Sequence, residues 1–199
     1  MPHRGESVKR VSVEGVVAES NQSAMSTAVA AAPPRKPPIL LLVLITIPVL
    51  VLDQITKLFV KAHMSLYETI PVVRNYIDIT YTQNPGAAFS MFAGYAPWFR
   101  AAFLFSMSAA AIVVLVVLLV RSDRISVTSI AFALILAGAA GNLIDRSIRG
   151  EVIDFIRLHY YDLSYPIFNV ADSAISIGVT LIVLATLFGR DDKDPRPAA

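Results

Sequence analysis

The sequence predicts an all-α polytopic membrane protein with four transmembrane helices and a small extracytoplasmic β-sheet formed by the first long loop. Two compositional observations support this fold class. Hydrophobic residues make up 55% of the 199 residues and charged residues only 16%, and the mean hydropathy is +0.62. These values exclude an ordinary soluble domain. The third observation is that several apolar runs reach the length of about 20 residues that a helix needs to cross a bilayer.

We place the membrane-spanning helices at about 39–60, 98–120, 125–144 and 170–188, so that residues 39–188 form one membrane domain. Residues 1–38 are rich in Ala and Pro and end in the segment PPRKPP, which predicts a disordered cytoplasmic tail. The apolar run after this tail begins too late and is too long for a cleavable signal peptide. Residues 189–199 are predicted to form a second cytoplasmic tail.

The orientation in the membrane follows only weakly from charge. As many Lys and Arg residues flank the spans on one side as on the other, so the positive-inside rule does not decide. The short turn from Arg121 to Arg124, with its two arginines, is typical of a loop that stays in the cytoplasm. We therefore place both termini in the cytoplasm and the two long loops on the opposite face.

Unusual polar residues gather at one end of the predicted bundle. When four helices alternate in direction, the end of the first, the start of the second, the end of the third and the start of the fourth meet at one face. An Asp toward the bilayer core costs about 2.5 to 3.5 kcal/mol, so such residues are functional candidates. Residues 70–81, rich in β-branched and aromatic side chains, predict a strand above this face. The polar residues are Asp53, Lys57, Arg100, Asn142, Asp145, Arg146, Asn169 and Asp172.

Several of these residues also have structural interpretations, which the sequence leaves open. Asp53 and Lys57 have the spacing and order of a helical ion pair, and Lys57 could extend to the membrane interface. The segment NPGAAF at residues 84–89 has Pro and Gly at the two central positions of a type II turn. Asp145 could be held by the adjacent Arg146 at a helix end.

Two further acids are equally ambiguous when taken singly. Asp172 could stabilise the start of its helix through the helix dipole, and Asp154 could be a loop acid on an interfacial strand or helix. Taken together, the acids indicate a catalytic pair. Two carboxylates held close in a partly dry site cannot both ionise easily, so they share a proton and can activate water while protonating a leaving amine. This is aspartic peptidase chemistry.

Four sequence blocks strengthen that interpretation, because they occur in the order seen in one family. The pattern closely resembles the lipoprotein signal peptidase (signal peptidase II) family over about residues 39–188, and the long N-terminal tail is the main departure from it. The blocks are DQITK (53–57), NPGAAFS (84–90), GNLIDR (141–146) with GEVIDF (150–155), and FNVADS (168–173).

The resemblance implies that Asp154 and Asp172 are the catalytic residues. Asp145 is the tempting alternative, but Arg146 beside it should keep it ionised as a salt-bridge partner and thus unable to hold a proton. The resemblance also implies a set of residues that bind substrate or shape the site. They are Asp53, Lys57, Asn84, Gly86, Asn142, Asp145, Arg146 and Asn169.

The implied substrate is a prolipoprotein carrying a diacylglyceryl-modified Cys, cut before that Cys at the extracytoplasmic face of the bacterial plasma membrane. The expected partners are therefore this substrate and membrane lipids, and we expect a monomer. The basic residues are dispersed, so nucleic acid is not an expected partner. With no Cys and three His far apart, no metal and no cofactor are expected.

Three other classes of protein fit less well. A proton-coupled transporter would carry its acids near the midplane of the membrane, whereas here they gather at one face. A Ser/Lys protease needs a Lys free to act as base, and Lys57 has Asp53 as its more natural partner. A purely structural membrane subunit explains none of the four blocks.

Overall fold

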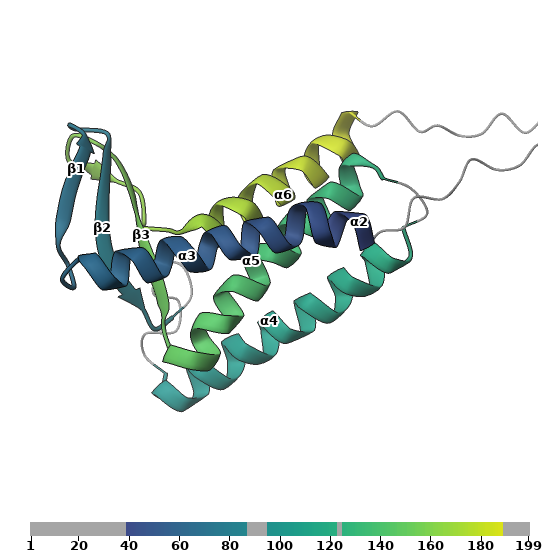
Figure 1. Ribbon diagram of the computed structural model, residues 1–199, viewed down its shortest axis with the longest axis horizontal. Coiled ribbons are helices and arrows are strands. Elements are labelled where there is room, and N and C mark those ends of the chain that lie inside the picture. Colours follow the sequence, from purple (N-terminus) through teal and green to yellow (C-terminus); the bar gives the residue numbers. More distant parts are fainter. Residues whose placement is uncertain (1–38, 87–94, 123–124, 189–199) are drawn as a thin grey trace, which may run out of the picture. The chain divides into compact units, whose positions relative to one another are not determined.

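The computed structural model describes residues 39–86, 95–122 and 125–188, and these described residues belong to one compact unit. The predicted tails 1–38 and 189–199 lie outside the described residues. Figure 1 shows long helices side by side, with strands at the end of the bundle where α3 ends. The elements are α2 (Ile39–Leu41), η1 (Leu42–Thr46), α3 (Ile47–His63), β1 (Thr69–Val73), β2 (Ile77–Asn84), α4 (Pro97–Val120), α5 (Val127–Arg149), β3 (Val152–Tyr160), β4 (Leu163–Ser164) and α6 (Val170–Phe188).

The four predicted spans are present among the described residues. The helices long and apolar enough to cross a membrane are Leu42–His63, Pro97–Val120, Val127–Arg149 and Val170–Phe188. The third span continues past the predicted end at residue 144 and stops where Gly150 takes a left-handed backbone conformation with φ 77°. The predicted end was therefore too early: the helix includes fully buried Asp145, which forms ion pairs with Lys57 and Arg149, and continues to Arg149.

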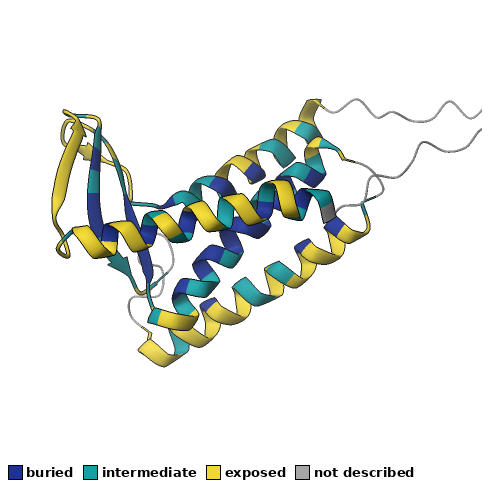
Figure 2. Cartoon of the chain, in the orientation of Figure 1, coloured by how far each residue is buried: buried dark blue, intermediate teal, exposed yellow. Residues whose placement is uncertain are grey.

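Helix α5 is the central helix of the bundle. It contacts α3, α4 and α6, and it is buried along most of its length whereas α4 is largely exposed (Figure 2). Small side chains allow this close packing, and a Cβ atom on Gly138 would collide with the carbonyl oxygen of Ala171 in α6. The start of α6 is therefore held directly against the middle of α5.

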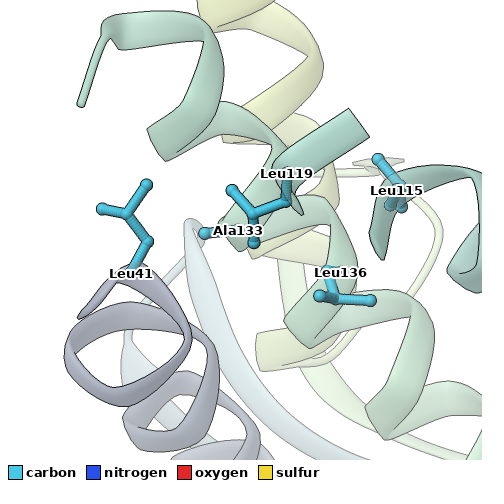
Figure 3. Packing of buried hydrophobic residues seen from close by; sticks show 5 residues of the cluster. All are labelled: Leu41, Leu115, Leu119, Ala133 and Leu136. Atoms are coloured by element: carbon cyan, nitrogen blue, oxygen red, sulfur yellow. The ribbon is translucent and has the colours of Figure 1, made fainter. Parts of the chain in front are cut away.

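A small hydrophobic cluster holds the end of the bundle away from the sheet. Leucines from α2 and α4 meet Ala133 and Leu136 of α5 in this cluster (Figure 3). The Thr46 hydroxyl at the end of η1 donates a hydrogen bond to the Ala133 carbonyl at 3.0 Å, which ties the first span to α5 by a polar contact as well. The polar residues of interest all lie toward the other end.

The predicted sheet is present, but its composition differs from the prediction in two ways. It has four strands in the order β1-β2-β3-β4, and adjacent strands are antiparallel. The run 70–81, expected to be one strand, is a hairpin of β1 and β2, because Asn75 turns the chain with φ 68° and Asn tolerates that conformation. The first long loop supplies only β1 and β2, and the loop between α5 and α6 supplies β3 and β4.

Candidate active site

Two aspartates from different elements line one cavity. Asp154 lies on β3 and Asp172 in the first turn of α6. The cavity has a volume of about 140 Å³, and a cavity can hold water above about 10 to 15 Å³, so there is room for water beside a substrate group. The charged and amide side chains that line it are Asn84, Arg146, Asp154 and Asp172. We call Asp154 and Asp172 the cavity pair.

Asp172 is positioned by the start of its own helix. The backbone N–H of Asn169 donates to Asp172 Oδ2 at 3.2 Å, and the backbone N–H of Asp172 donates to Asn169 Oδ1 at 2.9 Å. This reciprocal capping arrangement orients the carboxylate. The other oxygen, Asp172 Oδ1, accepts a hydrogen bond from the Asn142 amide at 2.8 Å.

Asp154 is held by two amide groups. Asn169 Nδ2 donates to Asp154 Oδ1 at 2.7 Å, and Asn84 Nδ2 donates to Asp154 Oδ2 at 3.1 Å. Asn84 reaches it because β2 and β3 pair with Asn84 opposite Val152 and Thr82 opposite Asp154. Asn169 thus contacts both members of the cavity pair.

The environment of Asp154 favours a bound proton. Asp154 is only 2% exposed, and burial, followed by the negative charge of Asp172, raises the pKa of Asp154 to about 7. The hydrogen bonds from Asn84 and Asn169 act in the opposite direction. Near neutral pH this carboxyl can therefore hold or release a proton. Asp172, with donors on both oxygens at a helix N-terminus, is suited to carry the negative charge.

A second pair of aspartates lies beside the cavity pair in a different environment. Lys57 Nζ is 2.8 Å from Asp53 Oδ2 and 2.9 Å from Asp145 Oδ2, and all three side chains are fully buried. Arg149 also forms an ion pair with Asp145. We call Asp53, Lys57, Asp145 and Arg149 the ionic cluster. The Asp53–Lys57 ion pair expected from the sequence is present, and the bonds of Lys57 leave it unsuited to act as a free base.

The prediction from the sequence that Arg146 is the salt-bridge partner of Asp145 was wrong. Asp145 pairs with Lys57 and Arg149, whereas Arg146 forms no salt bridge with any described residue and lines the cavity instead. The reason is helical geometry. Adjacent residues point about 100° apart, while residues four apart share a face, so Arg149 and not Arg146 lies next to Asp145.

Asn142 connects the ionic cluster to the cavity pair. Lys57 Nζ donates to Asn142 Oδ1 at 3.1 Å, so the Asn142 amide group must turn its NH₂ toward Asp172. A lysine ammonium can only donate, so it fixes which way this amide faces. Asp53 Oδ1 accepts from the backbone N–H of Ala171 at 2.9 Å, which anchors the first turn of α6. The first span therefore helps to position Asp172.

The structure brings together all ten site residues predicted from the sequence: hydrogen bonds and ion pairs link nine of them, and Arg146 lines the cavity beside Asp154 and Asp172. Gly86 lines the cavity and its N–H bonds to Asn84 Oδ1 at 3.0 Å. It lacks the positive φ of the type II turn that we considered. Ala87 to Ser90 of that block lie outside the described residues.

Two residues of the network, Gln54 and Arg149, were not predicted from the sequence. Gln54 donates a hydrogen bond to Asp53 at 3.0 Å. The four-residue spacing from Asp145 could have revealed Arg149.

No candidate metal centre stands out in the region that the structure covers. Among the described residues, no group of three or more His, Asp or Glu is arranged to hold a metal ion. The groups that donate hydrogen bonds to the cavity pair are the side-chain amides of Asn84, Asn142 and Asn169 and the backbone N–H of Asn169. Metal-independent chemistry stays a prediction.

Comparison with known proteins gives a consistent result. A family model for signal peptidase (SPase) II matches residues 45–188. The lipoprotein signal peptidase of Syntrophus aciditrophicus (strain SB) is 43% identical over 147 residues, covering 73% of this chain and 91% of that protein. The lipoprotein signal peptidase of Photorhabdus laumondii subsp. laumondii is 41% identical over 149 residues, covering 75% of this chain and 89% of that protein.

Solved structures agree with the sequence comparison. One, described as a bacterial membrane enzyme, has a TM-score of 0.68 and 31% identity and covers 81% of this chain and 94% of its own. A second has a TM-score of 0.65 and 33% identity, covering 76% and 92%. The protein is a multi-pass bacterial membrane peptidase, and its chain belongs to the signal peptidase II family.

Proposed function

We propose that this protein is an aspartic endopeptidase that removes the signal peptide from diacylglyceryl-modified prolipoproteins by cleaving before the lipidated Cys. One observation carries the aspartic assignment. Asp154 and Asp172 line the same cavity, and neither forms a salt bridge with a described cation, whereas Asp53 and Asp145 both do. Family membership supports the prolipoprotein substrate.

The proposed reaction uses the two carboxyl groups in opposite states. Ionised Asp172 takes a proton from a water molecule, whose oxygen attacks the scissile carbonyl carbon. Protonated Asp154 donates its proton to the carbonyl oxygen, giving a neutral tetrahedral intermediate. When the C–N bond breaks, Asp172 returns its proton to the leaving amine of the Cys, and the intermediate hydroxyl returns a proton to Asp154.

The remaining residues of the site have supporting roles in this proposal. Asn84 and Asn169 hold Asp154, and Asn142 and Asn169 hold Asp172. Arg146 provides a positive group in the cavity that can bind a substrate carbonyl. Asp53, Lys57 and Asp145 keep α3, α5 and the start of α6 in register. Because one chain supplies all of them, we propose that the monomer is active.

The location of the cavity fits a lipid-anchored substrate. Asp172 lies in the first turn of a membrane span, and Asp154 lies on the adjoining sheet. A scissile bond near the membrane surface can reach this position while the acyl chains of the substrate stay in the bilayer. We place the cavity at the extracytoplasmic face and both termini in the cytoplasm.

The test is cleavage by the purified full-length protein of one prolipoprotein in two forms, with and without the diacylglyceryl group. We expect cleavage of the lipidated form only, with the lipidated Cys at the new N-terminus. Activity should survive EDTA and thiol alkylation. Equal cleavage of both forms would contradict the proposed specificity, and loss on chelation with recovery on added zinc would contradict the aspartic mechanism.

A further inference from the structure

A second concavity adjoins the cavity that contains Asp154 and Asp172, which we call the catalytic cavity. The second space has a volume of about 390 Å³. Tyr165 and Pro166 line both spaces, so the two share a wall. We call the second space the sheet groove, defined by Leu158, Tyr160, Leu163, Ser164, Tyr165 and Pro166.

The sheet groove and the catalytic cavity lie on the same face of β3. Successive side chains of a strand point to opposite faces, so every second residue of β3 shares a face. On one face, Val152 and Asp154 line the catalytic cavity, and Leu158 and Tyr160 line the sheet groove. Phe155 lies on the other face, in a buried hydrophobic cluster that includes a residue of α3. The groove therefore continues the surface that carries Asp154.

The other wall of the groove is a segment that runs beside β3. β4 pairs with the end of β3, and the backbone N–H of Tyr165 donates to the carbonyl oxygen of Leu158 at 2.9 Å. Phe168 then forms an isolated bridge with Ile156. These backbone contacts hold the shared wall at a fixed position next to β3. The groove is therefore a built part of the sheet, directly beside the catalytic cavity.

The sheet groove lies outside the membrane-spanning helices. Its lining residues all precede α6, and none of them belongs to one of the four spans. β3 leads away from the end of α5 (Figure 1). The lining combines the apolar side chains of Leu158 and Leu163 with the hydroxyl groups of Tyr160, Ser164 and Tyr165. Such a surface suits a peptide, whose backbone groups need hydrogen-bond partners, better than an acyl chain.

We propose that the sheet groove binds the polypeptide that follows the lipidated Cys of the substrate, in an extended conformation. This inference rests on the proposed function, because that reaction divides the substrate at the catalytic cavity. The signal peptide and the acyl chains stay on the side of the bilayer. The segment after the Cys is the part of the substrate that can leave the cavity along the sheet.

The length of β3 indicates which substrate residues reach the groove. Leu158 and Tyr160 follow Asp154 by four and six positions in the strand. A substrate segment running beside the strand has the same rise of about 3.3 Å per residue. The groove should therefore contact the substrate from about the fourth to the sixth residue after the Cys.

The test uses two lipidated substrate peptides that differ only after the Cys. One has two residues there and the other has eight, with Val and Ser alternating in the added part. Cleavage by the full-length protein is measured in mixed micelles. The longer peptide should have a KM about fivefold lower, equivalent to about 1 kcal/mol of binding. Its kcat should be the same, because contacts remote from the scissile bond add binding to substrate and transition state alike.

Variants of the protein locate the effect of length. Leu163 and Tyr160 are 76% and 61% exposed, so Leu163→Ala and Tyr160→Ala remove groove surface without opening a core. Each should bring the KM of the longer peptide close to that of the shorter one. Tyr161→Ala is the matched control, since Tyr161 is 59% exposed and does not line the groove. It should preserve the fivefold ratio.

The outcomes separate this inference from the proposed function. Cleavage of both peptides with equal KM would overturn the inference and leave the peptidase activity standing. A fivefold ratio that persists in Leu163→Ala and Tyr160→Ala would also overturn it. Equal losses in Tyr160→Ala and Tyr161→Ala would identify a general contact of the tyrosines with the micelle and overturn it as well. If neither peptide is cleaved, the proposed function is contradicted, and the occupant of the groove with it.

Discussion

Two pairs of aspartates in this protein are linked through Lys57 and Asn142 but have opposite environments. Asp53 and Asp145 are fully buried, but Lys57 bridges them and Arg149 adds a second positive charge. Asp154 and Asp172 are held by amides from Asn84, Asn142 and Asn169 and have no described salt bridge. The comparison teaches that burial alone does not make a carboxyl group reactive. The charge of its neighbours decides whether it is a fixed anion or a group that exchanges protons.

The largest expected effect separates the two pairs by activity. Asp154→Asn and Asp172→Asn should each reduce turnover about a thousandfold or more, and the double variant should be hardly worse, because the two carboxyls act as a unit. The measurement is cleavage of the lipidated substrate at equal amounts of folded protein. Asp162→Asn, at an exposed position between β3 and β4, is the control and should retain full activity. Substantial activity in either single variant would refute the assignment.

The next effect concerns the stability of the ionic cluster. Lys57→Met leaves two buried carboxylates without their shared cation, so it should lower the free energy of unfolding by about 3 to 5 kcal/mol. Lys61→Met, an exposed lysine one turn further on, should change it by less than about 0.5 kcal/mol. Unfolding in mixed micelles measures both. If the two variants had equal free energies of unfolding, Lys57 would not stabilise the two buried carboxylates of the ionic cluster.

A smaller effect should appear in the pH dependence of activity. If Asp154 must carry a proton, kcat/KM should fall as pH rises through its pKa of about 7. The Asn84 hydrogen bond lowers that pKa, so Asn84→Ala should move the fall in activity to higher pH. Arg74→Ala, an exposed position between β1 and β2, should leave the profile unchanged. A shift to lower pH in Asn84→Ala would contradict the proton assignment.

Much of this arrangement could be predicted from the sequence, because hydrophobic length fixes the spans and alternation of direction fixes which helix ends meet. The order of the strands could not be predicted, since β3 pairs with β2 across a separation of about 70 residues. The partner of Asp145 was also missed, because the neighbouring Arg146 is nearer in sequence but faces another side of α5. The double role of Asn169 depends on side-chain geometry that spacing does not reveal.

The central claim is that Asp154 is an unneutralised acid while Asp145 is a neutralised one, and unfolding stability tests it most directly. The raised pKa of Asp154 means that the folded state holds a proton which the unfolded state releases above about pH 4. The stability that this proton contributes is present at low pH and is lost as pH rises to about 7. Asn cannot ionise, so the Asp154→Asn variant does not lose this stability as pH rises. Asp145→Asn instead leaves buried cations without one of their anionic partners.

The measurement is the free energy of unfolding of both variants and the unmodified protein at about pH 8 and about pH 4. At the higher pH, Asp154→Asn should be more stable than the unmodified protein by about 1 to 4 kcal/mol, and Asp145→Asn should be less stable. The gain for Asp154→Asn should disappear at the lower pH. If Asp154→Asn is instead the less stable protein at about pH 8, Asp154 is a paired anion like Asp145 and the account of the two pairs is wrong.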